Sequence, residues 1–390
     1  MKPSEERFRN PLPRRLVATL GALAAFGPLA TDVYLPALPD VGRDLGASPS
    51  ATALTLTGSI VGLGAGQLLV GPLSDRFGRR RPLLVGLAVF AVASVLCALA
   101  PTLGLLVAAR LLQALGGSAG IVLSRAVARD LRSGASLIRL FAVLVGISSL
   151  APVVAPVIGA QLVRFTSWHG VFVVLAVAGG LLFAAAAAWV PETLTPRDRH
   201  PGGVRAAARA YRGLLADPRF VIMMIAGALA FATLFSYITA SPFVLQEGLG
   251  VSPLAFSLVF ALNAVGLLVA TRFAARVPLP SGAVVLLSGA LLILFGVALP
   301  AAVLLGFLIV SIGFGLVIPG VSGLAMTTDA GPAGAAAALF GAVQYVLGGA
   351  TAPVASIGAE TSVLALGVIT TVAALGTLLC VSMATRQRGR

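Results

Sequence analysis

Twelve apolar stretches, each long enough to cross a membrane, run through this sequence of 390 residues. A helix needs about 20 mostly apolar residues to span the hydrocarbon core of a bilayer. Charged and turn-forming residues separate the stretches, which cover 16–38, 51–70, 82–100, 103–124, 140–163, 171–190, 220–245, 253–271, 282–299, 301–326, 333–357 and 363–384. The interval 277–328 carries no charge and is too long for one span, so we expect a turn near Pro300. The sequence predicts an all-α membrane protein with twelve transmembrane helices.

The composition excludes most other classes of protein. Apolar residues make up 58% of the chain and charged residues only 10%, whereas about 25% of a soluble domain is charged. The net charge of +14 does not indicate a nucleic-acid binder, because the arginines lie between apolar stretches rather than on a water-soluble face. Cys97 and Cys380 both lie inside apolar stretches, so we expect no disulfide, metal or cofactor.

The distribution of basic residues predicts the orientation of the chain. Of the 27 lysines and arginines, 22 lie on the side of the membrane that holds the N-terminus, and only Arg43 and Arg164 lie in loops on the other side. Cytoplasmic loops of membrane proteins accumulate such residues. We therefore expect both termini, and the polar segment 191–219, to be cytoplasmic.

The two halves of the chain are related in sequence. A shift of 204 residues aligns 45–63 with 249–267 and gives nine identities in nineteen positions. Both copies enter the membrane from the same side, which is typical of a parallel repeat of two six-helix halves. This predicts an N-terminal six-helix bundle over 1–190, a cytoplasmic linker over 191–219 and a C-terminal six-helix bundle over 220–390. A transporter with a central cavity between the halves is the expected architecture.

Asp32 and Arg110 are the two ionisable residues well inside the predicted spans. From the helical rise, both lie roughly 10 Å below the outer face, so their side chains could meet. Such residues are costly in a membrane without a partner or a water-filled cavity. One interpretation is a proton-responsive carboxylate biased by a fixed cation, and the other is a structural ion pair that only orients two helices.

Two prolines flank Asp32 at four residues on either side. Pro36 removes the helical hydrogen bond that the Asp32 carbonyl would accept. Pro28 removes the corresponding bond to the carbonyl four residues before it. Irregular backbone at membrane depth is tolerated where it lines a cavity. The segment TDVYLPALP is therefore expected to face the translocation path, although a kink made only for packing is the alternative.

The loop after the second span, GPLSDRFGRRRP, carries glycines for a tight turn, an aspartate and a run of arginines. A basic loop is usually only a topology signal, but this spacing resembles the motif G-x-L-x-D-R-x-G-R-R/K of the major facilitator superfamily. The residues in register are Gly71, Leu73, Asp75, Arg76, Gly78, Arg79 and Arg80. The resemblance implies a gating role for this loop.

Further matches narrow the resemblance. RLLQALGGSAG in the fourth span, with Gln113 one turn from Arg110, resembles a stretch whose arginine is implicated in proton coupling. The fifth span resembles the antiporter motif G-x8-G-P-x-x-G-G, although alanines occupy two of its glycine positions; its residues here are Gly146, Pro152, Ala155, Pro156 and Gly159. DVYLPALP, SWHGVF and PETL together resemble the Bcr/CflA group of drug:proton antiporters, which includes bicyclomycin and chloramphenicol exporters.

This resemblance implies a proton-coupled multidrug efflux transporter in the plasma membrane of a bacterium, exporting small, mostly apolar antibiotics. Protons, drug and the lipid bilayer are its expected partners, and the protein is expected to be a monomer without a cofactor. Proton coupling is assigned to Asp32 and Arg110. Aromatic and amide side chains suit flat apolar ligands, although aromatic residues in helices more often serve packing. The residues expected to line the substrate cavity are Tyr34, Gln113, Phe231, Phe235, Tyr237, Asn263, Phe340, Gln344 and Tyr345.

Three other functions were weighed against efflux. A membrane-embedded enzyme would need a nucleophile with a base, or clustered acidic, His or Cys ligands, and the spans offer one acid and no histidine. A pore is disfavoured by the repeat and by the lack of a charged selectivity ring. A proton-coupled importer or exporter of a specific small metabolite stays open, with the antiporter motif against an importer.

Overall fold

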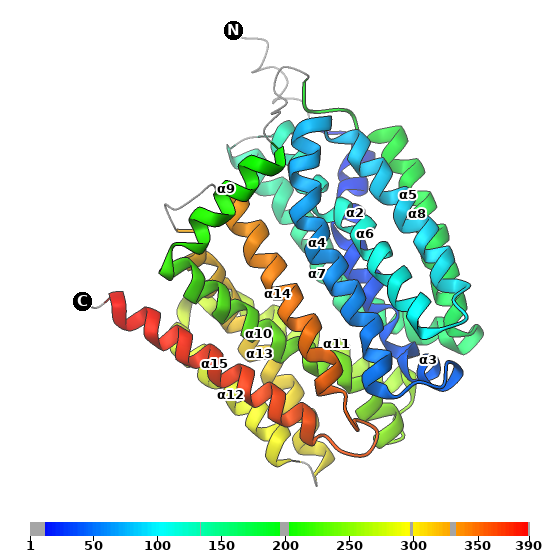
Figure 1. Ribbon diagram of the computed structural model, residues 1–390, viewed down its shortest axis with the longest axis vertical. Coiled ribbons are helices and arrows are strands. Elements are labelled where there is room, and N and C mark those ends of the chain that lie inside the picture. The colour runs from blue at the N-terminus through cyan, green and yellow to red at the C-terminus, as the bar shows by residue number, and fades with distance from the viewer. Residues whose placement is uncertain (1–11, 133, 196–202, 297–298, 328–332, 389–390) are drawn as a thin grey trace.

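The computed structural model describes residues 12–132, 134–195, 203–296, 299–327 and 333–388. The predicted cytoplasmic position of the leader, with Lys2, Arg7 and Arg9, and of Arg197, Arg199 and Arg390, falls outside the described residues. Within these ranges every regular element is a helix. Figure 1 shows the helices running roughly side by side as two groups, coloured blue to cyan-green and green to red.

The first group of helices comes from the first half of the sequence. Its members are α2 (Arg14–Asp32), the 3-10 turn η1 (Leu35–Ala37), α3 (Leu38–Asp44), α4 (Pro49–Phe77), α5 (Arg80–Ala98), α6 (Leu103–Leu131), α7 (Gly134–Phe165) and α8 (Trp168–Trp189). The second group contains α10 (Pro218–Pro242), the π-helical η3 (Phe243–Gly248), α11 (Pro253–Phe273), η4 (Ala274–Arg276), α12 (Leu279–Phe295), α13 (Pro300–Ala325), α14 (Ala333–Ala355) and α15 (Leu364–Arg388). Between them lies the short helix α9 (Gly203–Leu215).

Eleven of the described helical segments are long and apolar enough to cross a membrane, and α12 is a shorter apolar helix of 17 residues. The expected turn near Pro300 is confirmed, since α12 ends at Phe295 and α13 begins at Pro300. One expectation needs correction. The first span is not one helix over 16–38 but extends through α3 to Asp44 with a break after Asp32. The segment 191–219 contains α9 and the start of α10.

The internal repeat is visible in how two helices begin. Gly46 and Gly250 have positive φ angles of 60° and 65°, a conformation that glycine adopts without strain. Ser48 then caps α4 by accepting a hydrogen bond from the Ala51 amide at 3.3 Å, and a serine caps α11 in the same way at 3.2 Å. A proline follows each serine at the first helical position, where its missing N–H costs nothing. The identical residues therefore build the same turn twice.

Large apolar side chains lie exposed on the outside of both groups. Leu99 is 72% exposed and Phe295 is 80% exposed, and many valines and leucines of α5, α7, α8, α11 and α15 are also exposed. Extensive exposed apolar surface is unfavourable in water but matches a hydrocarbon environment. The polar residues that function would need must therefore lie inside the bundle or at its ends.

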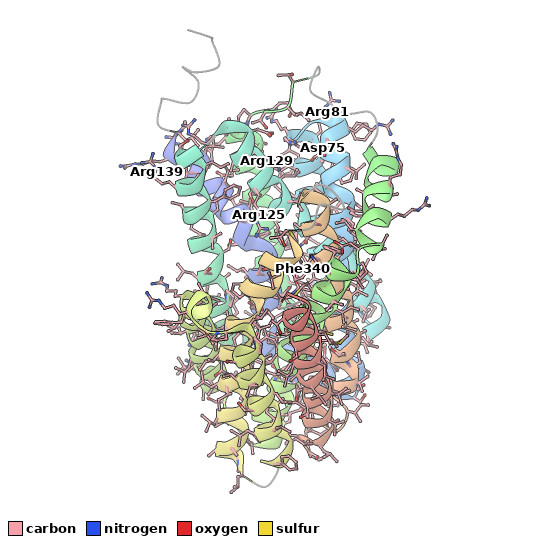
Figure 2. All side chains as sticks on the ribbon, turned by 90° about the vertical axis from the view of Figure 1, so that its left-hand side faces the viewer. Asp75, Arg81, Arg125, Arg129, Arg139 and Phe340 are labelled. Carbon is pink, nitrogen blue, oxygen red and sulfur yellow. The ribbon has the colours of Figure 1, made fainter. Side chains whose placement is uncertain are left out.

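Arginines mark one end of the molecule. Figure 2 shows Arg81, Arg129 and Arg139 at the same end as Asp75, and we call this the basic end. α2, α5 and α10 start there, and α4 and α6 finish there. The basic end thus contains the loops that the arginine count assigns to a single side.

The two groups contact each other mainly along α4 with α14 and along α7 with α11. Near the end opposite the basic end, the Ser50 hydroxyl donates to the Pro353 carbonyl at 2.8 Å, and the Thr57 hydroxyl donates to the Gly349 carbonyl at 2.7 Å. The Ser257 hydroxyl of α11 lies 2.9 Å from the carbonyl of Pro156 in α7. These bonds close that end of the junction between the two groups.

Candidate functional site

The helix that carries Asp32 ends at that residue. Pro28 lies inside the last turns of α2, Val33 and Tyr34 form a turn, and Pro36 lies in the 3-10 turn η1. The predicted irregular backbone in TDVYLPALP is therefore confirmed. Its cause is local, because proline cannot donate the hydrogen bond that continues an α-helix.

Asp32 ends α2, and the turn η1 that follows it packs against α10 and α11 of the second half. Among the described residues no salt bridge is formed by Asp32. The side chain is half-buried. A single acid without a cationic partner thus lies at the junction of the two groups, at membrane depth.

Arg110 is 1% exposed, and its side chain lies inside the first group of helices. Its Nη1 atom donates to the Gln113 side-chain oxygen at 2.6 Å, and the Ala30 carbonyl is 3.5 Å away. Its guanidinium carbon lies 4.8 Å from the ring centroid of Tyr34 and 5.5 Å from that of Phe172. Cation–π contacts of this kind partly compensate a desolvated charge.

The structure does not bring Asp32 and Arg110 together in an ion pair. Nε and Nη2 of Arg110 are buried without a hydrogen-bond partner in the described part of the chain. Similar depth along two helices does not give the direction in which a side chain points. Two buried guanidinium nitrogens without acceptors are costly, and they leave Arg110 able to bind an acceptor.

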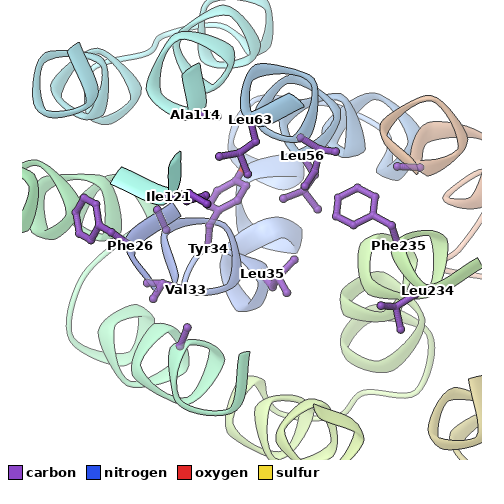
Figure 3. Packing of buried hydrophobic residues seen from close by; sticks show 14 of the residues in the cluster. Phe26, Val33, Tyr34, Leu35, Leu56, Leu63, Ala114, Ile121, Leu234 and Phe235 are labelled. Atoms are coloured by element: carbon purple, nitrogen blue, oxygen red, sulfur yellow. The ribbon is translucent and has the colours of Figure 1, made fainter. Parts of the chain in front are cut away.

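Tyr34 and Gln113, which the sequence places in the substrate cavity, are both buried inside the first group of helices. Tyr34 is fully buried, its hydroxyl lies 3.2 Å from that of Thr55, and its ring is 5.1 Å from the ring of Phe172. Figure 3 shows Tyr34 within the first group, beside Leu63 and Ile121. Gln113 donates to the Ser94 hydroxyl at 2.7 Å. Both residues instead surround Arg110.

The second half contributes a cluster of aromatic rings, which we call the aromatic cluster: Phe231, Phe235, Phe314 and Tyr345. Phe231 stacks on Phe235 with centroids 5.6 Å apart, meets Tyr345 edge-on at 5.3 Å and lies 6.2 Å from Phe314. Figure 3 shows Phe235 pointing toward Leu56 in the first half. Three of these rings were expected from sequence. Phe314 was not among the expected residues.

The other expected residues of the second half occupy two places. The Asn263 amide donates to the Tyr237 hydroxyl at 3.0 Å, and both residues are buried among α10, α11 and α13. The Gln344 amide donates to the Gly227 carbonyl at 3.1 Å, and Phe340 packs against the same glycine. Each of the two amide groups is thus satisfied by a partner within the second half.

The loop motif at the basic end forms a compact ionic network around Arg79. Arg79 Nη1 donates to Asp75 at 2.5 Å and to the Ser74 hydroxyl at 2.7 Å, while its Nε donates to Asp130 at 3.1 Å. Gly78 permits the turn with a φ of 89°. Gly71 and Arg76 belong to the last turns of α4, where Arg76 is exposed.

Two partners of this network were not found by the sequence argument. Asp130 comes from the end of α6, and the Glu192 carboxylate accepts from the backbone N–H groups of Arg79 at 2.8 Å and Arg80 at 3.2 Å. Burial opposes the charge of Arg79, but the Asp75 hydrogen bond and the charge of Asp130 outweigh it and raise the pKa of Arg79. The sequence signal for these partners is that both acidic residues lie in segments predicted on the same side of the membrane as the loop arginines.

The antiporter-like motif lies where α7 approaches the broken helix. A Cβ atom on Gly159 would lie 2.9 Å from the carbonyl carbon of Val33, directly after Asp32. Ala155 is buried and the Pro156 carbonyl accepts from α11, while a Cβ on Gly146 would meet nothing within 4 Å. Pro152 lies within the continuous helix α7. The motif therefore permits close packing at one end of α7 only.

Comparisons with known proteins agree with this architecture. A family model described as Major Facilitator Superfamily matches residues 20–353. The MFS-type transporter YdgK of Bacillus subtilis is 38% identical over 360 residues, covering 89% of this chain and 90% of that protein. The bicyclomycin resistance protein homolog of Haemophilus influenzae is 33% identical over 343 residues, covering 85% of this chain and 86% of that protein.

A solved structure gives the same fold. The bacterial homolog of the human lysosomal transporter Spinster, in an inward-facing and unoccupied conformation, matches with a TM-score of 0.74. The match covers 97% of this chain and 99% of that one, and at 15% identity it supports the fold alone. The family model and the two relatives support the assignment to a family. The chain is a multi-pass membrane transporter and belongs to the Major Facilitator Superfamily.

Proposed function

We propose that this protein is a proton-coupled multidrug efflux transporter that exports small, mostly apolar antibiotics by alternating access, and that it is not an enzyme. The observation that carries the proposal is the half-buried Asp32, which ends a broken helix where the next turn, η1, packs against α10 and α11 of the other half. The printed name of the Haemophilus influenzae relative, a bicyclomycin resistance protein homolog, supports a drug as the substrate.

Asp32 and Arg110 together carry proton coupling in this proposal. Asp32 takes a proton while it is exposed to the outer side and releases it to the cytoplasm after the halves have moved. Coupling requires only that the hydration and charged surroundings of Asp32 differ between the two states. Arg110 has two buried nitrogens without partners in the described part of the chain, so it can supply a positive field or an additional hydrogen bond when the halves rearrange.

The aromatic cluster is the proposed contact surface for the substrate. Rings that bury large apolar areas, with few polar groups beside them, suit flat ligands of mixed structure. Phe231 and Tyr345 are only partly buried, so they have surface left for a ligand.

The proposed topology assigns the basic end to the cytoplasm. The charge asymmetry of the loops supports this, and with it cytoplasmic termini in the plasma membrane of a bacterium. We further propose that the chain divides into bundles over 1–190 and 220–390 joined by 191–219. It acts as a monomer on small molecules and protons, without a nucleic-acid partner.

The test combines a susceptibility panel with a proton measurement. Cells that express the protein should tolerate higher concentrations of some antibiotics, and Asp32→Asn should abolish this protection. Purified, folded protein should release protons when such a drug is added, whereas Asp32→Asn should not. Asp40→Asn is the matched control, because Asp40 lies eight residues further along the same segment and forms a surface ion pair with Arg43.

Three outcomes would contradict the proposal. Proton release from folded Asp32→Asn would remove Asp32 as the coupling site. Loss of both Asp32→Asn and Arg110→Ala from the membrane through misfolding would favour a structural role for these charges. Protection from no antibiotic, together with pH-driven uptake of a metabolite into vesicles, would favour the metabolite transporter that the sequence left open.

A further inference from the structure

The linker between the two halves contains a helix that packs on both of them. One face of α9 lies against α4 of the first half and against α10 and α14 of the second, and Figure 1 shows it beside α14 near the basic end. Leu214 is fully buried in this contact, and partial burial raises the pKa of the Tyr211 phenol above its ordinary value. The apolar face of α9 is therefore already occupied by the protein itself.

The opposite face of α9 is basic and free. Arg209 and Arg212 are exposed, and neither forms a salt bridge with a described acid. They are three residues apart, a spacing that places both on one side of a helix. The helix GVRAAARAYRGLL contains no acidic residue. Its outward face thus carries uncompensated positive charge.

We propose that this face of α9 binds the phosphate groups of anionic phospholipids in the leaflet that adjoins the basic end. Guanidinium groups form paired hydrogen bonds with phosphate oxygens, and a basic helix at a membrane surface is attracted to anionic lipids. α9 packs directly against three membrane-spanning helices, so lipid headgroups are the anions available at its depth. The interaction anchors the linker at the bilayer surface. It goes beyond the proposed transport function and does not depend on the nature of the drug.

The test uses the full chain in nanodiscs, which expose both leaflets and so do not depend on membrane orientation. A fluorophore is attached to Ala208→Cys, an exposed position on α9, in a Cys380→Ser background; Cys97 is buried and does not react. Quenching by brominated phosphatidylglycerol should exceed quenching by brominated phosphatidylcholine. Arg209→Gln with Arg212→Gln should remove that excess. Loss of each arginine should lower the enrichment of anionic lipid beside α9 about fivefold.

Two matched variants separate α9 from charge in general. Arg209→Lys with Arg212→Lys keeps the charge and should keep most of the excess quenching. Arg272→Gln with Arg276→Gln removes the same charge from exposed arginines at the end of α11 and in η4, and should leave the quenching at α9 unchanged. Equal quenching of the native protein by the two brominated lipids would overturn the proposal. So would an equal decrease of the excess quenching in the α9 and α11–η4 glutamine variants. Size-exclusion profiles confirm that each variant is folded.

Discussion

Replacing Gly159 by alanine tests whether close approach of α7 to the broken helix holds the Asp32 segment in position. The added Cβ would lie 2.9 Å from the Val33 carbonyl carbon and 3.2 Å from its Cα, with the carbonyl oxygen closer still. These are backbone atoms, so no side-chain rotation relieves the contact. Non-bonded carbons prefer separations of about 3.5–4.0 Å, so α7 and the segment after Asp32 must separate by at least about 0.6 Å.

A forced displacement of this size in a packed interior costs about 1–3 kcal/mol. Such an energy changes an equilibrium constant by about 5- to 150-fold. Gly146→Ala is the control in the same helix and the same motif, because its Cβ would meet nothing within 4 Å. Alanine is favoured over glycine inside a helix by up to about 1 kcal/mol, so the control should be neutral or slightly stabilising.

The assay is thermal unfolding of purified protein, followed by intrinsic fluorescence of Trp168 and Trp189. Trp168 reports on the affected region, since its Nε1 donates to Asp44 in α3 at 2.9 Å. Gly159→Ala should lower the unfolding midpoint and drug protection in cells, and Gly146→Ala should preserve both. A Gly159→Ala midpoint equal to that of the native protein, or equal decreases in the two variants, would refute the packing argument.

Three further predictions concern the gate, the closed end and the topology. Asp75→Asn removes a half-exposed ion pair and should lower the free energy of unfolding by about 1 kcal/mol. It should slow transport while drug binding stays measurable. An unchanged transport rate would mean that the loop is only a topology signal. Ser50→Ala with Thr57→Val removes two hydrogen bonds that join the halves, each of which contributes about 0.5–1.5 kcal/mol of stability. The double variant should increase the labelling of junction residues from outside, and unchanged labelling would show that these bonds do not hold the halves together. In intact cells, a single cysteine in place of Gly250 should react with an impermeant reagent, and one in place of Arg205 should be protected. The reverse pattern would overturn the topology.

Much of the architecture is readable from the chain because the relevant physics is local or one-dimensional. A bilayer of constant thickness requires a span of a certain length, so apolar runs located the spans and the turn at Pro300. The proline pair around Asp32 predicted the break in the first span, since the loss of a backbone donor acts on its own helix. The repeated glycine and serine at 46, 48, 250 and 252 build the same capped turn twice, again from neighbouring residues.

The candidate site is different, because it depends on which way each helix is turned about its own axis. Helical rise predicts similar depths for Asp32 and Arg110, yet no ion pair joins them in the described part of the chain, and Arg110 lies against Tyr34 and Gln113 inside its own half. Rotation about the axis is set by packing against neighbouring helices, whose choice involves residues far away in the sequence.

The same reason explains the missed partners at the basic end. Asp130 and Glu192 reach Arg79 and Arg80 across separations of 51 and 112 residues, and no local pattern links them. The sequence by itself indicated the apolar helical segments and the break in the first one, because the membrane and the prolines act on each segment separately. Only the tertiary structure decided which buried charges meet, because that depends on how the faces of different helices fit together.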